Sequence, residues 1–409
     1  MKVNLKALTE QEIVKFAENQ GQSPYRAKQI INWIYKKYAT SLEEMTDLSK
    51  SFRELLNKTA FISSLKLLQK QTSKDGAQKF LFELEDGKTI ESVLIPDKDR
   101  LTLCISSQVG CAMGCKFCVT GKLGLKRNLK AYEIIDQIIS VSRIMARNSI
   151  TPPVLPLNKG RNEEGLIRVR GDSSPSKITN IVFMGMGEPL HNFPEVLEAI
   201  RRITDLLGFS KRRVTLSTVG IAPKIFELAE KAPRINLAIS INATTDEIRN
   251  KIMPINQKYH LKELLNACRK FPLEPRRQIT FEYVLLEGIN DSKEDALRLI
   301  NLLKGIKSKV NLIPYNNPPP GIQEAPPTPL SKRFEQLKRF KSFEPFKQFK
   351  KTDFRAPAEE RILAFQKILQ NAGITAIIRK SKGGDIFAAC GQLKTTYFLR
   401  NSSTTFKSS

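Results

Sequence analysis

The chain has 409 residues, and 67 lysines and arginines against 41 acidic residues give it a formal net charge of +26 at pH 7. This length suffices for one large domain plus a small one, and the positive excess favours a polyanionic partner, RNA or DNA, over a basic surface kept only for solubility. An apolar signal segment and an apolar run long enough to cross a bilayer are both missing, so we expect a cytoplasmic protein that does not enter a membrane.

Residues 1–60 are predicted to form a small helical domain. Thr9 is a suitable N-cap for the amphipathic run that follows it, and a second apolar stripe comes after that run. Basic helices of this kind suit RNA binding, although a domain that only packs against the rest of the chain fits the pattern nearly as well. Residues 61–99 alternate in polarity on both sides of Asp86-Gly87, which predicts a strand-rich connector with a hairpin turn at that dipeptide.

Strands and amphipathic helices alternate from residue 100 to residue 392. The expected strands are 101–107, 178–184, 213–218, 234–241, 279–286, 309–315 and 374–380. The expected helices are 131–147, 194–206, 221–231, 261–271, 293–304 and 358–371. Repeated strand-then-helix units indicate an α/β fold with a parallel sheet and with helices outside it.

Two insertions interrupt this alternation, at 149–177 and at 317–357. The first is rich in proline, glycine and charge, which predicts a mobile loop. The second interleaves phenylalanines with lysine and arginine. That composition suits base stacking beside phosphate contacts, and it equally suits a short amphipathic helix packed on the main domain. The tail, 393–409, is expected to be flexible.

Cys111, Cys115 and Cys118 form a C-x-x-x-C-x-x-C loop. Three thiolates are one ligand short of a closed iron–sulfur or tetrahedral zinc site, and no fourth ligand is near in sequence. A metal centre with one open position can bind a substrate, so the loop is predicted to be catalytic. Structural zinc would need a second cysteine or histidine pair, and six cysteines in 409 residues are too sparse for a disulfide framework.

Polar residues follow several of the expected strands, where parallel β/α barrels gather their reactive groups. The residues in question are GMGE (185–188), Ser217, Ser240, Asn242 and Asn316. Glycine lets a backbone approach a ligand closely, and Glu188 can bind a charged amino group. Ordinary turn chemistry also places serine and asparagine at strand ends.

Three more cysteines lie outside the loop. Cys104 closely precedes it, and Cys390 lies in the glycine-flanked segment GGDIFAACGQL. A buried cysteine is more often inert packing than a reactive group, and Cys268, on an amphipathic helix, fits that description.

With these motifs the chain resembles a known family. The cysteine spacing is that of the radical S-adenosylmethionine (SAM) enzymes. The blocks TLCISSQVGCAMGCKFC, MGMGEPL, KRRVTLSTVG, NLIPYN and DIFAACGQL are similar to those of the bacterial dual-specificity RNA methyltransferases. That family methylates carbon 2 of adenine in 23S rRNA and in tRNA, and the resemblance spans nearly the whole chain.

The resemblance implies a fold and two cofactors. The fold would be a partial (βα)6 radical SAM barrel with a small helical amino-terminal domain and a strand-rich extension. The cofactors would be a 4Fe–4S cluster, held by the three loop cysteines, and SAM. The residues implied to bind SAM are Gly187, Glu188, Ser217, Ser240, Ile241, Asn242 and Asn316.

The resemblance also implies catalytic roles for Cys390, Glu91 and Cys104. Carbon 2 of adenine is electron-poor and cannot attack the methyl group of SAM, which is why the family uses radical chemistry. Cys390 would accept a methyl group from one SAM. A radical derived from a second SAM would take hydrogen from that methyl group, and the resulting carbon radical would add to adenine. Glu91 would remove the carbon-2 proton, and Cys104 would attack the Cys390 sulfur, forming a transient disulfide and releasing the methylated base.

The expected partners are 23S rRNA, tRNA and an electron donor such as a flavodoxin system, and we expect a monomer. Asn242 stands where relatives commonly have histidine, and both insertions are longer than in typical members. Two alternatives stay open: a related enzyme that methylates carbon 8 of adenine, and a non-catalytic iron–sulfur RNA-binding protein. The second alternative would have no use for Cys104, Cys390 and the GMGE motif together.

Overall fold

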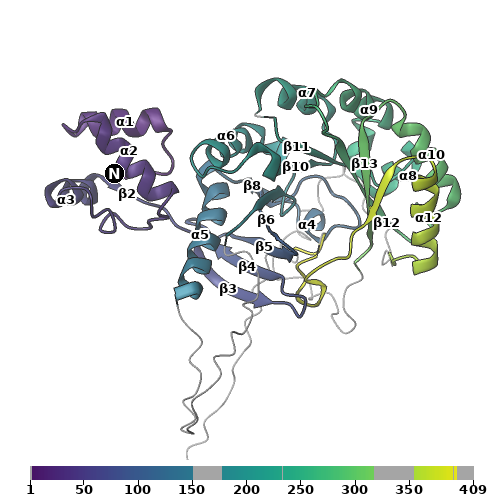
Figure 1. Cartoon of the computed structure of the whole chain (residues 1–409), viewed down its shortest axis with the longest axis horizontal. Helices are drawn as coiled ribbons and strands as arrows, with labels where there is room; N and C mark the ends of the chain where they lie inside the picture. Colours follow the sequence, from purple (N-terminus) through teal and green to yellow (C-terminus); the bar gives the residue numbers. More distant parts are fainter. Residues whose placement is uncertain (1, 151–176, 233, 317–353, 390, 394–409) are drawn as a thin grey trace, which may run out of the picture.

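The structure is a computed structural model that describes residues 2–150, 177–232, 234–316, 354–389 and 391–393 (Figure 1). These ranges leave out almost all of the two proposed insertions, 149–177 and 317–357, and of the tail, 393–409. Cys390 also lies outside them, whereas both of its chain neighbours are described.

One continuous ten-stranded sheet organises the described residues, in the order β14-β13-β12-β11-β10-β9-β6-β5-β4-β3. The strands from β14 to β6 are all parallel to one another, which confirms the predicted α/β class. They are β6 (Arg100–Cys104), β9 (Asn180–Phe183), β10 (Val214–Thr218), β11 (Asn236–Ser240), β12 (Ile279–Leu285), β13 (Ser308–Pro314) and β14 (Thr375–Ile378).

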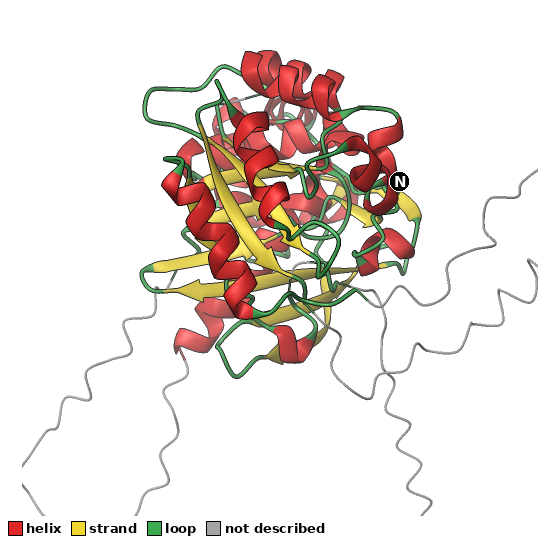
Figure 2. Ribbon diagram, turned by 90° about the vertical axis from the view of Figure 1, so that its right-hand side faces the viewer, coloured by secondary structure: helices red, strands yellow, loops and turns green. Residues whose placement is uncertain are grey.

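Helices cover the outer side of the curved parallel sheet (Figures 1 and 2). They are α5 (Ala131–Ile150), α6 (Phe193–Asp205), α7 (Ala222–Lys231), α8 (Asp246–Ile252), α9 (Leu261–Lys270), α10 (Lys293–Leu303) and α12 (Glu359–Asn371). Their apolar spacing explains the packing. In α6, for example, Val196, Ile200 and Ile203 recur at helical period and are fully buried, each contributing about 2 kcal/mol of apolar burial. The sequence did not predict the short helix α8.

The antiparallel strands β3 (Lys66–Thr72), β4 (Gln78–Glu83) and β5 (Thr89–Asp97) extend the same sheet beyond β6. The predicted hairpin turn is confirmed, because Gly87 adopts φ 76° between β4 and β5. Strand β5 pairs directly with β6 from Val93 opposite Cys104 to Asp97 opposite Arg100. Residues of the extension therefore share a sheet face with the first parallel strand.

The amino-terminal helices lie beside α5 and α6 (Figure 1). Thr9 caps the first of them through a reciprocal capping box with Glu12, as its sequence predicted. Two buried contacts fasten this part of the chain. Lys6 pairs with Asp136 of α5, and Arg202 of α6 donates to the Lys6 carbonyl at 2.7 Å. The elements are β1 (Val3–Asn4), α1 (Glu10–Asn19), α2 (Pro24–Tyr35), α3 (Lys50–Thr59) and β2 (Ala60–Phe61).

Within the described ranges, every helix is too short or too polar to cross a lipid bilayer.

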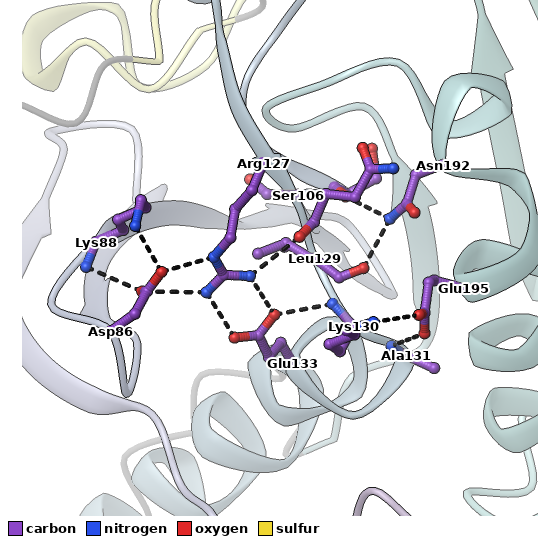
Figure 3. Close-up of polar contacts among 12 residues, drawn as sticks. Asp86, Lys88, Ser106, Arg127, Leu129, Lys130, Ala131, Glu133, Asn192 and Glu195 are labelled. Carbon is purple, nitrogen blue, oxygen red and sulfur yellow. Dashed lines mark hydrogen bonds and ion pairs between the residues drawn. The ribbon is translucent and has the colours of Figure 1, made fainter.

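Arg127 joins the hairpin of the extension to the start of α5 (Figure 3). Its guanidinium donates to Asp86 at 2.7 and 3.1 Å and to Glu133 at 2.7 and 2.8 Å. The hydrogen bonds from Arg127 hold the pKa of Asp86 well below its usual range. Arg127 lies on the short strand β8 (Leu125–Asn128), which returns from the cysteine loop. The network therefore fixes the end of that loop against the extension.

We expect Arg127→Met to lower the free energy of unfolding by about 2 kcal/mol, because Glu133 is buried and would lose its counter-ion. Urea unfolding measures the loss. Lys130→Met is the matched control, since Lys130 forms an exposed pair with Glu195 at 3.1 Å and should cost less than about 1 kcal/mol. Equal losses of unfolding free energy in the two variants would show that the Arg127 network stabilises the fold no more than an exposed ion pair does.

Candidate active site at the carboxyl ends of the parallel strands

The three-cysteine loop connects the short strand β7 (Gln108–Gly110) to the short helix α4 (Val119–Lys122). Cys111 N–H donates to the Gly124 carbonyl at 3.1 Å, and Cys118 N–H donates to the Cys115 carbonyl at 3.1 Å. Gly110 adopts φ 78°, and a Cβ there would lie 1.9 Å from the Gly124 oxygen, so only glycine fits. The loop is thus folded back on itself by its own backbone.

Cys111 and Cys115 are buried, and Cys118 is half-buried beside them. Burial raises the pKa of each of them, of Cys111 to about 12, and each thiol interacts electrostatically with another of the set. Yet within the described ranges no three histidine, cysteine or acidic side chains are close enough to hold a single metal ion. A zinc ion needs its thiolates about 2.3 Å away on all sides, whereas a four-iron cube gives each cysteine its own iron. The loop fits a cluster better than zinc.

Glu188 lies next to this loop, at the end of β9. It is 2% exposed and accepts hydrogen bonds from Thr218 Oγ1 at 2.7 Å, Val219 N–H at 2.8 Å and Leu190 N–H at 2.9 Å. Burial raises the pKa of Glu188 to about 7, and the groups that lower it are these hydrogen-bond donors rather than cations. The charge of Glu188 also raises the pKa of Cys111, which places the two groups near each other. A cationic amino group would complete this site.

Gly187 holds Glu188 in place for a reason that differs from the one inferred from the sequence. Gly187 adopts φ 100°, and a Cβ there would lie 2.5 Å from the Cβ of Gln108. Gln108 in turn accepts a hydrogen bond from Glu188 N–H at 2.8 Å and donates to Asn128 at 2.7 Å. Close packing against a protein side chain therefore already requires glycine here. Gln108 was not found from the sequence, because a neutral glutamine in a strand carries no chemical signal.

The other residues expected to contact SAM lie at the same edge of the sheet. Ser217, Ser240 and Asn316 are half-buried near the ends of β10, β11 and β13, and Ile241 is fully buried. Asn242 adopts φ 53°, its amide oxygen accepts from Val284 N–H at 2.8 Å, and its amide nitrogen lies 3.3 Å from the sulfur of Met253. The Asn242 side chain therefore holds neighbouring protein segments together.

Arg249 is a second residue that the sequence did not indicate. It is fully buried and donates to the carbonyls of Val219 at 2.6 Å and Ile241 at 3.0 Å. Burial lowers the pKa of Arg249 to about 10, and its positive charge lowers the pKa of Cys115. Arg249 thus joins two strand ends and places a positive charge beside the cysteine loop.

Glu91 and Cys104 occupy one face of the sheet. Lys79 of β4 pairs with Val93 of β5, and Val93 pairs with Cys104 of β6, so these residues form a row across three strands. Glu91 is two residues from Val93 and therefore points to the same face. Burial raises the pKa of the Cys104 thiol to about 12, which keeps it neutral.

The chain on both sides of residue 390 lies between Cys104 and the cysteine loop. Ala388 and Leu393 belong to one apolar cluster with Cys104. On the opposite side, the Gly391 carbonyl accepts from Val119 N–H at 2.8 Å, directly after Cys118. The Leu393 carbonyl accepts from Thr120 Oγ1 at 2.8 Å. Residues far apart in sequence, the loop cysteines, Cys104 and the neighbours of Cys390, thus meet in one place.

Known proteins resemble this chain in sequence and in overall fold. Residues 3–62 match the ribosomal RNA large subunit methyltransferase N-terminal domain, and residues 165–300 match the radical SAM superfamily. The chain is 44% identical to the dual-specificity RNA methyltransferase RlmN of Syntrophobacter fumaroxidans, over 97% of this chain and 99% of that protein. It is 45% identical to that of Geotalea uraniireducens, over 96% and 97%. The crystal structure of a radical SAM methyltransferase from Sphaerobacter thermophilus matches 96% of this chain and 100% of that one, with TM-score 0.77 and 36% identity.

Glu188 makes stability depend on pH in a defined direction. Its folded-state pKa of about 7 lies above the ordinary 4.5, so Glu188 prefers to be neutral in the folded protein. The folded state therefore has its full stability below pH 4.5, where Glu188 is neutral, and loses stability as the pH rises through 7 and Glu188 ionises. We expect cluster-free wild-type protein to lose up to about 3 kcal/mol of unfolding free energy over this range relative to Glu188→Gln. Urea unfolding at a series of pH values measures the difference. The control Glu263→Gln, at an exposed site on α9, should show the same pH dependence of stability as the wild type. If the stability of Glu188→Gln changed with pH in parallel with wild type, the raised pKa of Glu188 would be contradicted.

Proposed function

Because the chain belongs to the RlmN family of dual-specificity RNA methyltransferases within the radical SAM superfamily, we propose that it methylates carbon 2 of an adenine in 23S rRNA and of an adenine in tRNA. The family membership makes it a SAM-dependent RNA methyltransferase. One observation carries the finer proposal. Cys104 and Glu91 share a sheet face that is covered by the neighbours of Cys390, beside the three-cysteine loop.

The enzyme uses a 4Fe–4S cluster and SAM, which together supply the radical that makes the electron-poor carbon 2 reactive. We assign the cluster to Cys111, Cys115 and Cys118, whose neighbouring thiols offer sulfur ligands only. Glu188 would bind the amino group of SAM, since it is a buried carboxyl beside that loop. The other SAM contacts that we propose are Gly187, Ser217, Ser240, Ile241, Asn242 and Asn316.

The remaining steps use side chains of the sheet face. Cys390 would carry the methyl carbon as a thioether and become joined through it to the base. Glu91 would accept the proton of carbon 2, and the unpaired electron left on the adduct would return to the cluster, so that a closed-shell thioether remains. The Cys104 thiol would lose its proton and attack the Cys390 sulfur, so that a disulfide forms while the sulfur–carbon bond breaks. The electron pair of that bond stays with the carbon, which takes up a proton and becomes the new methyl group.

The charge of the chain is consistent with these substrates. A net charge of +26 favours contact with the phosphates of both 23S rRNA and tRNA. Residues 1–60 would act as the RNA-binding accessory domain. A flavodoxin-type electron donor, a monomeric state and a cytoplasmic location complete the proposal.

Analysis of the nucleoside product tests the function. We expect reconstituted protein, SAM and a reductant to produce 2-methyladenosine in a 23S rRNA fragment and in tRNA, detected by mass spectrometry. Cys390→Ala should abolish the product but retain iron, because the methyl carrier is lost and the cluster loop is intact. Cys268→Ala, at a buried cysteine on α9, should retain the product. Formation of 8-methyladenosine, or full activity of Cys390→Ala, would refute the proposal.

Cys104→Ala should trap RNA on the protein, because no thiol can then break the bond between Cys390 and the base. A denaturing gel of the reaction would show a protein–RNA adduct in this variant and little or none in Cys268→Ala. Release of methylated RNA by Cys104→Ala at the wild-type rate would exclude Cys104 as the resolving thiol.

A further inference from the structure

We propose that Lys79 is a positioning residue that keeps the Glu91 carboxyl ionised and directs it toward the segment that carries residue 390. The inference rests on the proposed role of Glu91 as proton acceptor. Lys79 was not a candidate from the sequence, where it is one of many lysines in an alternating strand.

Two contacts of the Lys79 ammonium group carry the inference. Its Nζ lies 3.2 Å from Glu91 Oε1, and the two side chains are only 8% and 4% exposed. The same Nζ donates to the Phe387 carbonyl at 3.4 Å. Lysine is almost never buried to this extent unless it is paired. Lys79 therefore links the carboxyl to the chain three residues before Cys390.

The strand register explains how a lysine comes to this position. Lys79 lies opposite Val93 on β5, and Glu91 lies opposite Leu81, two residues further along β4. Lys79 and Glu91 are thus diagonal neighbours on one sheet face, a separation that a long side chain spans. Burial follows because the segment around Phe387 covers that face.

The charge of Lys79 matters because Glu91 is buried. A carboxyl removed from water tends to keep its proton unless a cation or hydrogen-bond donors stabilise the charged form. A proton acceptor must be ionised at the working pH. Lys79 of β4 lies 3.2 Å from the Glu91 carboxyl, Cys104 of β6 contributes a neutral thiol to the same sheet face, and the covering segment contributes the Phe387 carbonyl, which accepts from Lys79. Of these, Lys79 supplies the positive charge.

The covering segment is held by the same hairpin that carries Lys79. Asp75 accepts from Gly383 N–H at 2.7 Å. Asp385 accepts from Ser73 Oγ at 2.5 Å and from Lys74 N–H at 3.2 Å. The turn between β3 and β4 therefore fixes one end of the segment, and Lys79 holds it again next to Glu91. The covering segment is thus attached at two points, and its contact with Lys79 Nζ holds the ammonium group beside the Glu91 carboxyl.

The first test reads the charge state of Glu91 without requiring turnover. Infrared difference spectra of the purified protein near pH 7 are compared for wild type, Lys79→Met, Lys79→Arg and Lys66→Met. Lys66 is the matched control, since it pairs with Glu83 at 2.8 Å on the same hairpin but is 73% exposed. Relative to the wild-type spectrum, which already contains the partly protonated Glu188, we expect an additional protonated-carboxyl band in Lys79→Met only, lost when Glu91→Gln is added. A folded Lys79→Met protein without this band would overturn the inference.

The second test uses the reaction. At pH 7, Lys79→Met should form methylated RNA about tenfold more slowly or worse and accumulate the protein–RNA adduct, with the KM for RNA unchanged. Raising the pH should restore the rate, because Glu91 then loses its proton. Lys79→Arg should retain most activity, and Lys66→Met should keep the wild-type pH profile. Suppose that infrared spectra show Glu91 to be protonated in Lys79→Met while its rate and pH profile equal those of wild type. That result would refute Glu91 as the proton acceptor, and the inference about the charge state of Glu91 would still stand.

A stability measurement covers the case in which Lys79→Met folds poorly. Removing one member of a buried pair leaves the other charge uncompensated, whereas removing both does not. Lys79→Met combined with Glu91→Gln should therefore be more stable than Lys79→Met alone. A double variant as unstable as the single one would overturn the inference.

Discussion

The pairing of β5 with β6 is the constraint on which the rest of the site depends. It makes the antiparallel extension and the parallel barrel one sheet, so the alternation of side chains along the strands continues across their junction. Glu91 and Cys104 come from opposite sides of that junction and still share a face. A shift of the register by one residue would move Glu91 to the opposite face, among the residues that contact α5.

Burial is the second common feature of the site. The loop thiols, Cys104 and Glu188 all have a raised pKa because they are removed from water. Burial keeps the thiols neutral and favours the neutral form of Glu188 until a partner of suitable charge or a reaction step alters them. The same burial requires compensation, which Arg249 provides beside the cysteine loop and Lys79 provides beside Glu91.

Much of the fold could be predicted from the sequence, because strands, helices and the turn at Gly87 follow from local periodicity and turn chemistry. The cysteine loop and Glu188 were found because their residue types carry a chemical signal. Gln108, Arg249 and Lys79 were missed because their roles depend on tertiary register and burial. Lys79 is buried only because a segment some three hundred residues later in the chain lies over its strand. No local pattern reports such a contact.

The central claim is that Cys104 and Cys390 react with each other across this sheet face during RNA methylation. The most direct measurement is a single turnover with a limiting electron donor, quenched in acid, alkylated and analysed by peptide mass spectrometry. The account predicts one disulfide-linked peptide pair, from residues 104 and 390, for each methylated adenine formed. Methylated adenine produced while both cysteines are recovered as free, alkylated thiols would contradict it.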